Sequence, residues 1–365
     1  MKEIKAKDYS IFVSTTISKD IVRFLKANKK GYSKLFILVD ENSLQHCYPQ
    51  LVSTVPQFES AEIIEIESGE ENKTIEVCIQ LWEALSEMKA DRKALFINLG
   101  GGVISDLGGF VASSFKRGID FINVPTTLLA QVDASIGGKV GVDLNHLKNQ
   151  IGVFNNPKAV FVNSDFINTL HIRHVLSGFA EIIKHALIAD KAYWQLITAS
   201  DFSDPDYLNS LIATSIHIKN QIVLDDPNEK NTRKRLNFGH TIGHAIETFS
   251  LESQSQKHLL HGEAVAIGLI CESYLSHKVG KLSKEELAEI TQFILTNFKP
   301  VVIDKLDAHR LIELMMHDKK NEKGEINFSL ISSIGKCEIN KKASSDMIID
   351  SLNYYTNEIK HFRNA

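Results

Sequence analysis

The chain has 365 residues, of which 43% are hydrophobic and 24% are charged, and its formal net charge at pH 7 is −4. This composition is typical of a soluble globular protein that is long enough to form two domains. The slightly acidic balance excludes a global field that attracts nucleic acid or an anionic membrane, so anion binding requires a local cluster of lysines and arginines.

The N-terminal residues and the cysteines indicate a cytoplasmic protein. The first ten residues, MKEIKAKDYS, mix charges and lack the apolar run of a signal peptide. No stretch reaches the roughly 18 apolar residues that span a bilayer. Cys47, Cys78, Cys271 and Cys337 are scattered and form no C-x-x-C, so they predict neither a metal knuckle nor a disulfide framework. We expect no membrane and no nucleic-acid partner.

Short apolar runs alternate with helical patterns in the first half of the chain. Alternation of this kind predicts βαβ units and a mostly parallel sheet, in which ligands collect beyond the carboxyl ends of the strands. We therefore predict an α/β fold with a Rossmann-like NAD-binding domain over residues 1–165. The expected strands cover residues 35–39, 63–66, 94–99, 121–124 and 159–162, and residues 75–88 form an expected amphipathic helix.

The second half changes character after about Asp165. It shows little strand pattern before residues 326–331, and Pro300 separates two of its helical stretches. We predict a mainly α-helical domain over residues 166–365. Its expected helices cover residues 178–189, 208–224, 240–249, 262–277 and 284–298.

A glycine-rich segment, residues 100–109 (GGGVISDLGG), follows an expected buried strand and opens a helix. Glycines let a backbone approach a pyrophosphate, and the helix N-terminus favours its charge. The alternative is a tight strand–helix turn without a ligand. Asp40, at the end of the first expected strand, suits a ribose hydroxyl, and it suits capping of the next helix equally well.

A second glycine-rich stretch, residues 133–139 (DASIGGK), is followed by Leu147, Lys148 and Asn149. Two lysines and an asparagine in a glycine-rich loop suit a phosphorylated or carboxylated ligand. The alternative is a solvated loop. The small and apolar neighbours of the lysines favour the ligand site.

Histidines and a buried acid suggest a metal site. His240 and His244 are at i, i+4, which puts both rings on one helix face, and catalytic zinc usually takes three protein ligands. The alternative is a pair of surface or core histidines. Glu181 and Lys184, at i, i+3, form either a surface ion pair or a buried pair, and their apolar neighbours favour burial. A buried carboxylate requires a partner, and a metal is one.

Five motifs together resemble one enzyme family. The glycine segment, DASIGGK, FAEIIK (179–184), NFGHTIGHAIE (237–247) and HGEAVAIG (261–268) occur in the order and at the spacings found in 3-dehydroquinate synthases. The chain resembles this family, part of the sugar-phosphate cyclase superfamily, over residues 68–336. The resemblance implies a homodimeric lyase of the shikimate pathway, which serves aromatic amino acid biosynthesis, with NAD and zinc (or cobalt) as cofactors.

The implied reaction converts 3-deoxy-D-arabino-heptulosonate 7-phosphate to 3-dehydroquinate and phosphate. It comprises transient oxidation by NAD, elimination of phosphate, re-reduction and an aldol cyclisation. Within this resemblance the zinc ligands match Glu181, His240 and His261, whereas spacing alone had paired His240 with His244.

The resemblance also implies residue roles. The catalytic positions are His244, which handles protons, with Lys184, Lys139 and Asn237. The substrate positions are Asp133, Lys139, Asn149, Lys184, Lys219, Arg233, Asn237, His244 and, across the dimer interface, Arg117. Together with Asp40, the NAD positions are Ser68, Gly69, Glu70, Glu71, Asn72, Lys73, Gly102, Val103, Ile104, Ser105, Asp106, Thr126, Thr127, Lys139, Lys148, Phe166, Ile167, Asn168 and Thr169.

Some positions depart from the family pattern or align less surely. Leu147 stands where many members have glycine, and the polar segment 248–260 offers His258 as a competing ligand. Lys319 or Lys320 provides a late phosphate contact. Three other functions remain open: a cyclase for glucose 6-phosphate or sedoheptulose 7-phosphate, a metal-dependent polyol or glycerol dehydrogenase, and a nucleotide-binding module without activity.

Overall fold

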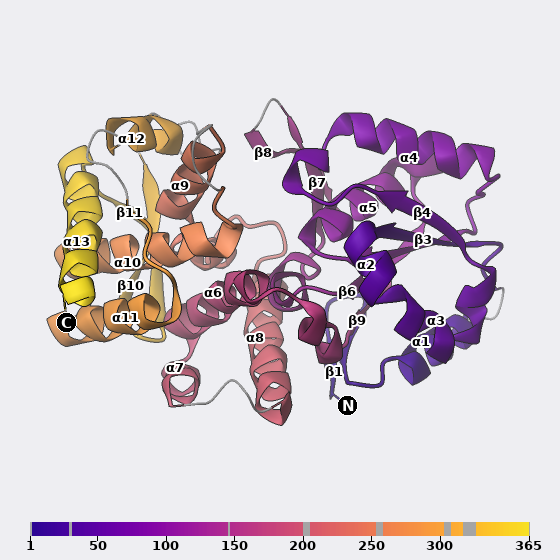
Figure 1. Cartoon of the computed structure of the whole chain (residues 1–365), viewed down its shortest axis with the longest axis horizontal. Coiled ribbons are helices and arrows are strands. Elements are labelled where there is room, and N and C mark those ends of the chain that lie inside the picture. The colour runs from indigo at the N-terminus through magenta and orange to yellow at the C-terminus, as the bar shows by residue number, and fades with distance from the viewer. Residues whose placement is uncertain are drawn as a thin grey trace. The chain divides into compact units, whose positions relative to one another are not determined.

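A computed structural model describes residues 2–28, 31–144, 147–199, 205–252, 258–302, 308–316 and 326–364. The chain forms two compact units (Figure 1). The first comprises Met1–His171 and Ser203–Leu224, and the second comprises Ile172–Phe202 and Asp225–Ala365. Compared with the expected domains 1–165 and 166–365, the first unit also includes residues 166–171 and the helix at residues 205–224.

The first unit contains a 7-stranded sheet in the order β1-β2-β9-β6-β5-β3-β4. Only the β1–β2 pair is antiparallel, and the other neighbours are parallel, so the predicted Rossmann-like sheet is confirmed. The strands are β1 (Lys2–Lys5), β2 (Ser10–Val13), β3 (Leu35–Asp40), β4 (Glu62–Ile66), β5 (Leu95–Gly100), β6 (Asp120–Pro125) and β9 (Ala159–Val162).

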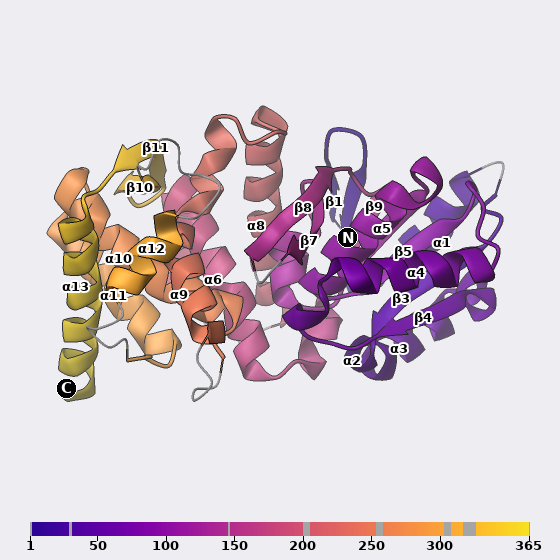
Figure 2. The ribbon, with the colours of Figure 1, turned by 90° about the horizontal axis from the view of Figure 1, so that it is seen from above.

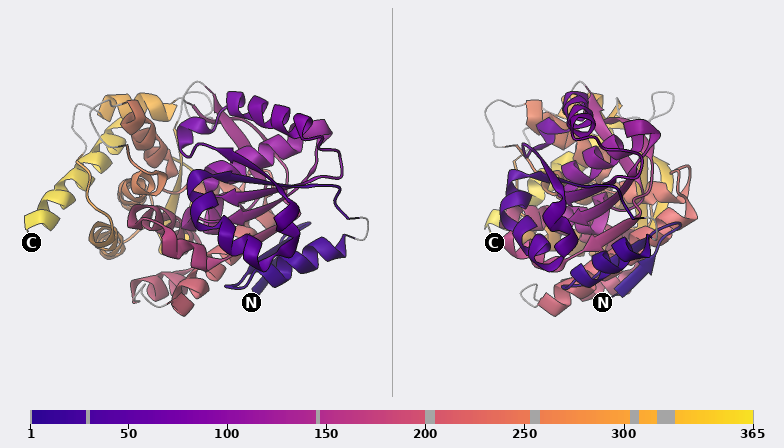
Figure 3. Two further views of the ribbon diagram at one scale, coloured as in Figure 1. Left: turned by 45° about the vertical axis from the view of Figure 1, so that its right-hand side comes forward. Right: turned by 90° about the vertical axis from the view of Figure 1, so that its right-hand side faces the viewer.

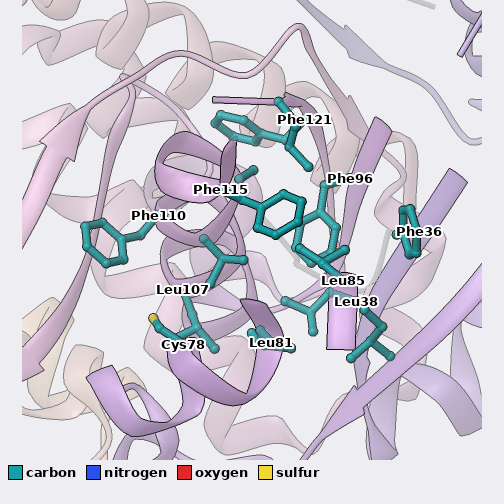
Figure 4. Packing of buried hydrophobic residues seen from close by; sticks show 14 of the residues in the cluster. Phe36, Leu38, Cys78, Leu81, Leu85, Phe96, Leu107, Phe110, Phe115 and Phe121 are labelled. Atoms are coloured by element: carbon teal, nitrogen blue, oxygen red, sulfur yellow. The ribbon is translucent and has the colours of Figure 1, made fainter. Parts of the chain in front are cut away.

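Helices cover both faces of this sheet (Figure 3). Successive residues of β3 alternate between two cores: Phe36 and Leu38 face α4 and α5, and Ile37 and Val39 face α1 and α3. Burial on both faces explains why the strands are continuous apolar runs. Figure 4 shows Leu107 of α5 beside Cys78 and Leu81 of α4 in the first core. The helices are α1 (Ser18–Ala27), α2 (Glu41–His46), α3 (Tyr48–Thr54), α4 (Ile75–Glu87), α5 (Gly102–Ser114) and α8 (Pro205–Asp225).

A separate antiparallel hairpin, β7 (Lys139–Leu144) and β8 (Leu147–Phe154), contains Lys139, Lys148 and Asn149, which the sequence had placed in a glycine-rich loop. Gly141 lies opposite Gly152, and a Cβ on Gly152 would lie 2.6 Å from the Val140 carbonyl oxygen. The paired glycines therefore let the two strands approach closely. Val140 and Val142 anchor the hairpin against α5. Gly137 (φ 95°) and Gly138 (φ 67°) do lie in a turn before β7, as expected for a glycine-rich loop, so the loop interpretation was wrong only for Lys139, Lys148 and Asn149, which lie in the strands.

The second unit is mainly helical, as predicted (Figure 2), and most residues of α10 are buried. No helix in the described part of the chain is long and apolar enough to cross a membrane. The sequence patterns had not indicated α12, β11 or α13. The elements are α6 (Ile172–Ala189), α7 (Lys191–Thr198), α9 (His240–Glu252), α10 (His261–Val279), α11 (Lys284–Asn297), α12 (Ala308–Met316), β10 (Asn327–Ser333), β11 (Lys336–Lys342) and α13 (Ser345–Asn364).

Candidate metal centre and ligand-binding residues

Three helices of the second unit meet where α10 begins. The Gly262 N–H donates to Ser177 Oγ at 2.9 Å, and any Cβ on Gly262 would collide with the Ser177 backbone. Glycine therefore lets α6 pass against the first turn of α10. His261 begins α10, and Glu181 lies one turn beyond Ser177 on α6, so this crossing brings the two side chains together.

Glu272 fixes the start of α9. Its carboxylate is fully buried and accepts hydrogen bonds from the Gly239 N–H (2.7 Å) and the Ile242 N–H (3.0 Å). Gly239 has a φ of 78°, a left-handed conformation that suits glycine. The acid on α10 thus satisfies amide groups at the N-terminus of α9 and favours its dipole. His240, the first residue of α9, is held in place as a result.

Glu181, His240, His244 and His261 form what we call the histidine cluster. Glu181 Oε1 lies 3.3 Å from His240 Nε2 and 3.6 Å from His261 Nε2. The ring centroids of the three histidines are 5.2 to 5.6 Å apart. Glu181 has no exposed surface. The structure therefore brings together the residues that the sequence had singled out for the metal site.

The hydrogen bonds of Nδ1 in His240 and His261 determine the tautomer of each ring, and so whether the Nε2 atom that faces Glu181 is an acceptor. His240 Nδ1 lies 3.1 Å from the Phe238 carbonyl oxygen, and His261 Nδ1 lies 3.1 Å from Glu247 Oε2. A carbonyl oxygen and a carboxylate only accept, so each Nδ1 carries the proton. In a neutral ring Nε2 is then an acceptor, and two such atoms face the acceptor Glu181.

Burial and neighbouring charges set the pKa values in this cluster. Burial would raise the pKa of Glu181, but Lys184 and His240 outweigh burial and lower it well below its ordinary value. Burial lowers the pKa of His240, which keeps that ring neutral at pH 7. Burial would also lower the pKa of His261, but Glu247 and Glu181 raise it to about 9.

The donor set fits a divalent cation such as zinc, which binds imidazole nitrogen and carboxylate oxygen. One ligand atom from each of His240, His244 and His261 lies within 4.8 Å of the others. Glu181 contacts His240 and His261 but also an ammonium, that of Lys184. Geometry alone therefore admits either Glu181 or His244 as the ligand that joins His240 and His261.

The other expected substrate residues of the second unit have polar contacts. Lys184 is buried and forms an ion pair with Glu181. Arg233 is 1% exposed, and its Nη1 donates to the Pro227 carbonyl oxygen at 2.7 Å. Asn237 Nδ2 donates to Glu229 Oε1 at 3.0 Å.

The loop that carries Arg233 is held by Asp226. The Asp226 carboxylate accepts from the N–H groups of Lys230 (3.0 Å), Asn231 (2.6 Å) and Arg233 (3.2 Å). Burial would raise the pKa of Asp226, and these N–H groups lower it instead. Sequence analysis missed this residue because nothing in the local pattern shows which amides a carboxylate reaches.

The first unit contains a second group of ionisable residues, which we call the Lys73 cluster: Lys73, Glu70, Asp106, Asp143 and Asn149. Lys73 is 4% exposed, and its Nζ lies 2.8 Å from Asp106 Oδ2 and 2.7 Å from Asn149 Oδ1. Glu70 and Asp143 lie 3.7 and 4.0 Å away. Burial opposes the charge on Lys73, but Asp106 and the other acids raise its pKa.

The Lys73 cluster joins residues expected for NAD to a residue expected for substrate. Asn149 has a φ of 53°, and its N–H donates to Asp143 Oδ1 at 2.7 Å. Because an ammonium only donates, Lys73 must face the amide oxygen of Asn149, which leaves the Asn149 NH₂ group directed away from it. Lys148 forms an ion pair of 3.2 Å with Glu70.

The glycine turn follows β5, as predicted, and Gly101 precedes the first residue of α5. The Thr126 N–H donates to the Gly100 carbonyl oxygen at 2.9 Å, and a Cβ on Gly101 would lie 3.1 Å from Thr127 Cγ2. The carboxyl ends of β5 and β6 therefore meet at the expected NAD residues Thr126 and Thr127. The expected residues Gly102, Val103, Ile104, Ser105 and Asp106 form the first turns of α5.

Asp40 caps a helix, which was the alternative that the sequence left open. Its Oδ1 accepts from the Ser43 N–H at 2.7 Å, and its own N–H donates to Ser43 Oγ. Its ribose role stays a prediction.

The other expected NAD residues lie in two further segments. The segment of Ser68, Gly69, Glu70, Glu71, Asn72 and Lys73 is tied to α2, because Ser68 donates from its N–H and its hydroxyl to Glu41. Phe166 and Ile167 are buried, and Asn168 and Thr169 are exposed.

Asp133 and Lys219, both expected to bind substrate, contact each other within the first unit. Lys219 Nζ lies 2.8 Å from Asp133 Oδ1 and donates to the Asp133 carbonyl oxygen at 2.6 Å.

The remaining expected residues lie elsewhere in the chain. Lys139 is exposed at the start of β7. Arg117 is exposed and has a φ of 70°. Lys319 and Lys320 lie outside the described residues. His258 Nδ1 lies 2.9 Å from the Ser250 carbonyl oxygen.

Comparisons with known proteins match most of the chain to one family. The family model for the N-terminal part of 3-dehydroquinate synthase matches residues 63–177, and that for the C-terminal part matches residues 178–321. The chain is 43% identical to the 3-dehydroquinate synthase of Parabacteroides distasonis over 95% of this chain and 98% of that protein. It is 36% identical to that of Ruminiclostridium cellulolyticum over 91% and 92% of the two chains.

Solved structures show the same fold at lower identity. A 2-deoxy-scyllo-inosose synthase in complex with carbaglucose-6-phosphate, NAD⁺ and Co²⁺ has a TM-score of 0.83 at 23% identity, over 97% of this chain and 99% of that one. A 2-epi-5-epi-valiolone synthase from Streptomyces hygroscopicus with NAD⁺ and Zn²⁺ gives 0.84 at 23%, over 98% and 99%. The glycerol dehydrogenase of Schizosaccharomyces pombe gives 0.67 at 13%, over 100% and 93%.

Proposed function

Because the chain belongs to the 3-dehydroquinate synthase family, we propose that it converts 3-deoxy-D-arabino-heptulosonate 7-phosphate to 3-dehydroquinate and phosphate. The observation that carries this proposal is the match of both family models in sequence order, in a chain that is 43% identical to a 3-dehydroquinate synthase over nearly its whole length. The histidine cluster supplies a chemical reason for the match.

We propose that a divalent metal, zinc in the first instance, is held by Glu181, His240 and His261. The convergence of a buried carboxylate and two Nε2 acceptors supports this set. Solved proteins of the same fold contain Co²⁺ or Zn²⁺ together with NAD⁺. When bound, such a metal lowers the pKa of a coordinated hydroxyl and polarises the carbonyl formed from it.

NAD is the second proposed cofactor. The glycine turn at the N-terminus of α5 and the adjacent ends of β5 and β6 support binding of its pyrophosphate. Asp106, in the first turns of α5, contacts Lys73, which also contacts Glu70. Glu70 in turn pairs with Lys148. Since the hydride is returned before product forms, the proposed reaction consumes no NAD.

The chain's own polar residues would hold the substrate and move protons. Lys184 and His244 lie at the histidine cluster, where a hydroxyl of the substrate would bind. In the first unit, Asp133, Lys139, Asn149 and Lys219 are the proposed substrate residues. Arg233 and Asn237 are the proposed residues of the second unit. Cations among them would neutralise the charge that develops on the departing phosphate.

The homodimer, the phosphate contact of Arg117 across its interface and the cytoplasmic location remain predictions. Arg117 is exposed at a left-handed turn after α5, which leaves its guanidinium accessible to a second chain. Sedimentation compares the assembly of the wild type with that of Arg117→Ala, and the KM for the heptulosonate phosphate compares their phosphate binding. Only phosphate binding should change in the variant.

The proposed function is tested with the pure, metal-loaded protein, the heptulosonate phosphate and a small amount of NAD. We expect phosphate and 3-dehydroquinate to form in equal amounts, in large excess over the NAD present. Steady accumulation of NADH with glycerol as the substrate would instead indicate a dehydrogenase. Turnover of glucose 6-phosphate or sedoheptulose 7-phosphate, without turnover of the heptulosonate phosphate, would indicate another cyclase.

A further inference from the structure

Glu247 is a buried acid of α9 to which the family resemblance gave no role. Its side chain is 5% exposed, and its Oε2 lies 3.1 Å from Nδ1 of His261, the first residue of α10. The contact is with the back of the ring, since the other ring nitrogen, Nε2, lies 3.6 Å from Glu181 Oε1.

The packing of two helices creates this contact. A Cβ on Gly243 of α9 would lie 3.1 Å from Val265 Cα of α10, so glycine lets the two helices approach closely there. Glu247 lies one turn beyond Gly243, and His261 one turn before Val265. The short separation lets a glutamate of α9 reach the ring of His261.

The contact with Glu247 has two chemical consequences. A carboxylate only accepts hydrogen bonds, so it selects the His261 tautomer with the proton on Nδ1 and leaves the Nε2 lone pair for a cation. Its negative charge also makes Nε2 more basic. Nε2 of His240 does not gain basicity in this way, because Nδ1 of His240 donates to the neutral Phe238 carbonyl oxygen.

We propose that Glu247 is a positioning residue of the metal site, which strengthens metal binding by orienting and polarising His261. The proposal rests on the ligand set in the proposed function, namely Glu181, His240 and His261. Outer partners of metal-bound histidines typically contribute about 10- to 100-fold in metal affinity. Glu247 then belongs to the site although it does not touch the metal.

The test compares the Zn²⁺ dissociation constants of metal-free variants, measured by competition with a chromophoric chelator. We expect about 10- to 100-fold weaker binding in Glu247→Ala. Glu247→Gln should show a smaller loss, because an amide oxygen still accepts from Nδ1 but carries no charge. Glu252→Gln is the matched control, since this glutamate of α9 is 43% exposed and pairs with Arg310. It should bind Zn²⁺ like the wild type.

A second comparison asks whether Glu247 acts through His261. In a His261→Ala background, with Zn²⁺ titrated to millimolar concentration, Glu247→Gln should cause no further loss of affinity. An equal loss in both backgrounds overturns the proposal, as does a Zn²⁺ affinity of Glu247→Gln within twofold of that of Glu252→Gln. If His261→Ala itself leaves Zn²⁺ binding unchanged, the ligand set is wrong instead. Glu247→Gln has the size of the native residue, so it decides the matter even if Glu247→Ala does not fold.

Discussion

The histidine cluster of the second unit and the Lys73 cluster of the first unit both concentrate ionisable side chains, but they balance charge differently. Around Lys73, an ammonium is matched by the carboxylates of Asp106, Glu70 and Asp143. In the histidine cluster, Glu181 pairs with the ammonium of Lys184, but it also faces the Nε2 atoms of two rings whose Nδ1 protons are already donated to other acceptors.

This difference separates a cluster of paired charges from one that also presents two imidazole lone pairs to a cation. Opposite charges in the Lys73 cluster satisfy one another, so it can orient its neighbours without a bound cation. Acceptors that face each other repel unless a proton or a metal lies among them. The comparison teaches that the kind of partner, and not the number of charged residues, identifies a metal site. Five substitutions test this account.

The largest effect is expected from His240→Ala and Glu181→Ala. Each removes a proposed ligand, so bound metal should fall to background, and turnover should fall by about 10³-fold or more because several kcal/mol of charge stabilisation is lost. Metal analysis and phosphate release measure the two effects. His217→Ala, at an exposed position of α8, is the control. Full metal occupancy in both variants would refute the ligand assignment.

A somewhat smaller effect is expected from His244→Ala. If His244 moves protons and does not bind the metal, the variant should keep its metal while turnover falls by about 10²- to 10⁴-fold. The same two measurements apply. Loss of metal in this variant would instead support the pairing of His240 with His244 that spacing alone suggests, which the distances between the three histidines also permit.

Lys73→Met tests whether the charges of the Lys73 cluster stabilise one another. It leaves acids without their cation, and we expect a loss of roughly 2–3 kcal/mol in the free energy of unfolding, less than for a fully buried pair because Asp106 and Glu70 are partly exposed. Urea denaturation measures it. Lys158→Met, whose lysine is 54% exposed, is the control. A loss no larger than that of Lys158→Met would contradict the pairing of Lys73 with these acids.

The smallest effect is expected from Asp226→Asn, because Asp226 is satisfied by neutral N–H groups. The pKa of Asp226 is lowered in the folded protein, so its contribution is present above the ordinary carboxyl pKa and is lost as pH falls through the folded value. We expect the variant to be less stable by about 1–2 kcal/mol at pH 7. The difference from wild type should shrink below about pH 3–4. A difference independent of pH would contradict this.

Much of the fold could be predicted from the sequence, because its strands and helices carry regular patterns. The run at residues 35–39 and the helical pattern at 75–88 correspond closely to β3 and α4. The β7–β8 hairpin could not be predicted in the same way. Gly137 and Gly138, just before it, indicated a loop, and only the pairing of Gly141 with Gly152 shows that two strands follow.

The site was predictable to a different extent. Spacing alone pairs His240 with His244 within one helix, whereas the assignment of Glu181 and His261, which lie on other helices, as the ligands that join His240 came from the family resemblance. Glu247 and Glu272 escaped notice for a similar reason: each acts on a neighbouring helix, and periodicity carries no information about contacts between helices. The capping role of Asp40 was visible because its partner, Ser43, lies three residues away.

The ligand set is the central claim, and a crystal structure of the zinc-loaded protein, with anomalous data at the zinc absorption edge, tests it most directly. We predict one peak about 2.0–2.2 Å from Nε2 of His240, Nε2 of His261 and a carboxylate oxygen of Glu181. His244 should lie beyond bonding distance of that peak. A peak bonded to His244 and not to Glu181, or no zinc at these side chains, would contradict the account.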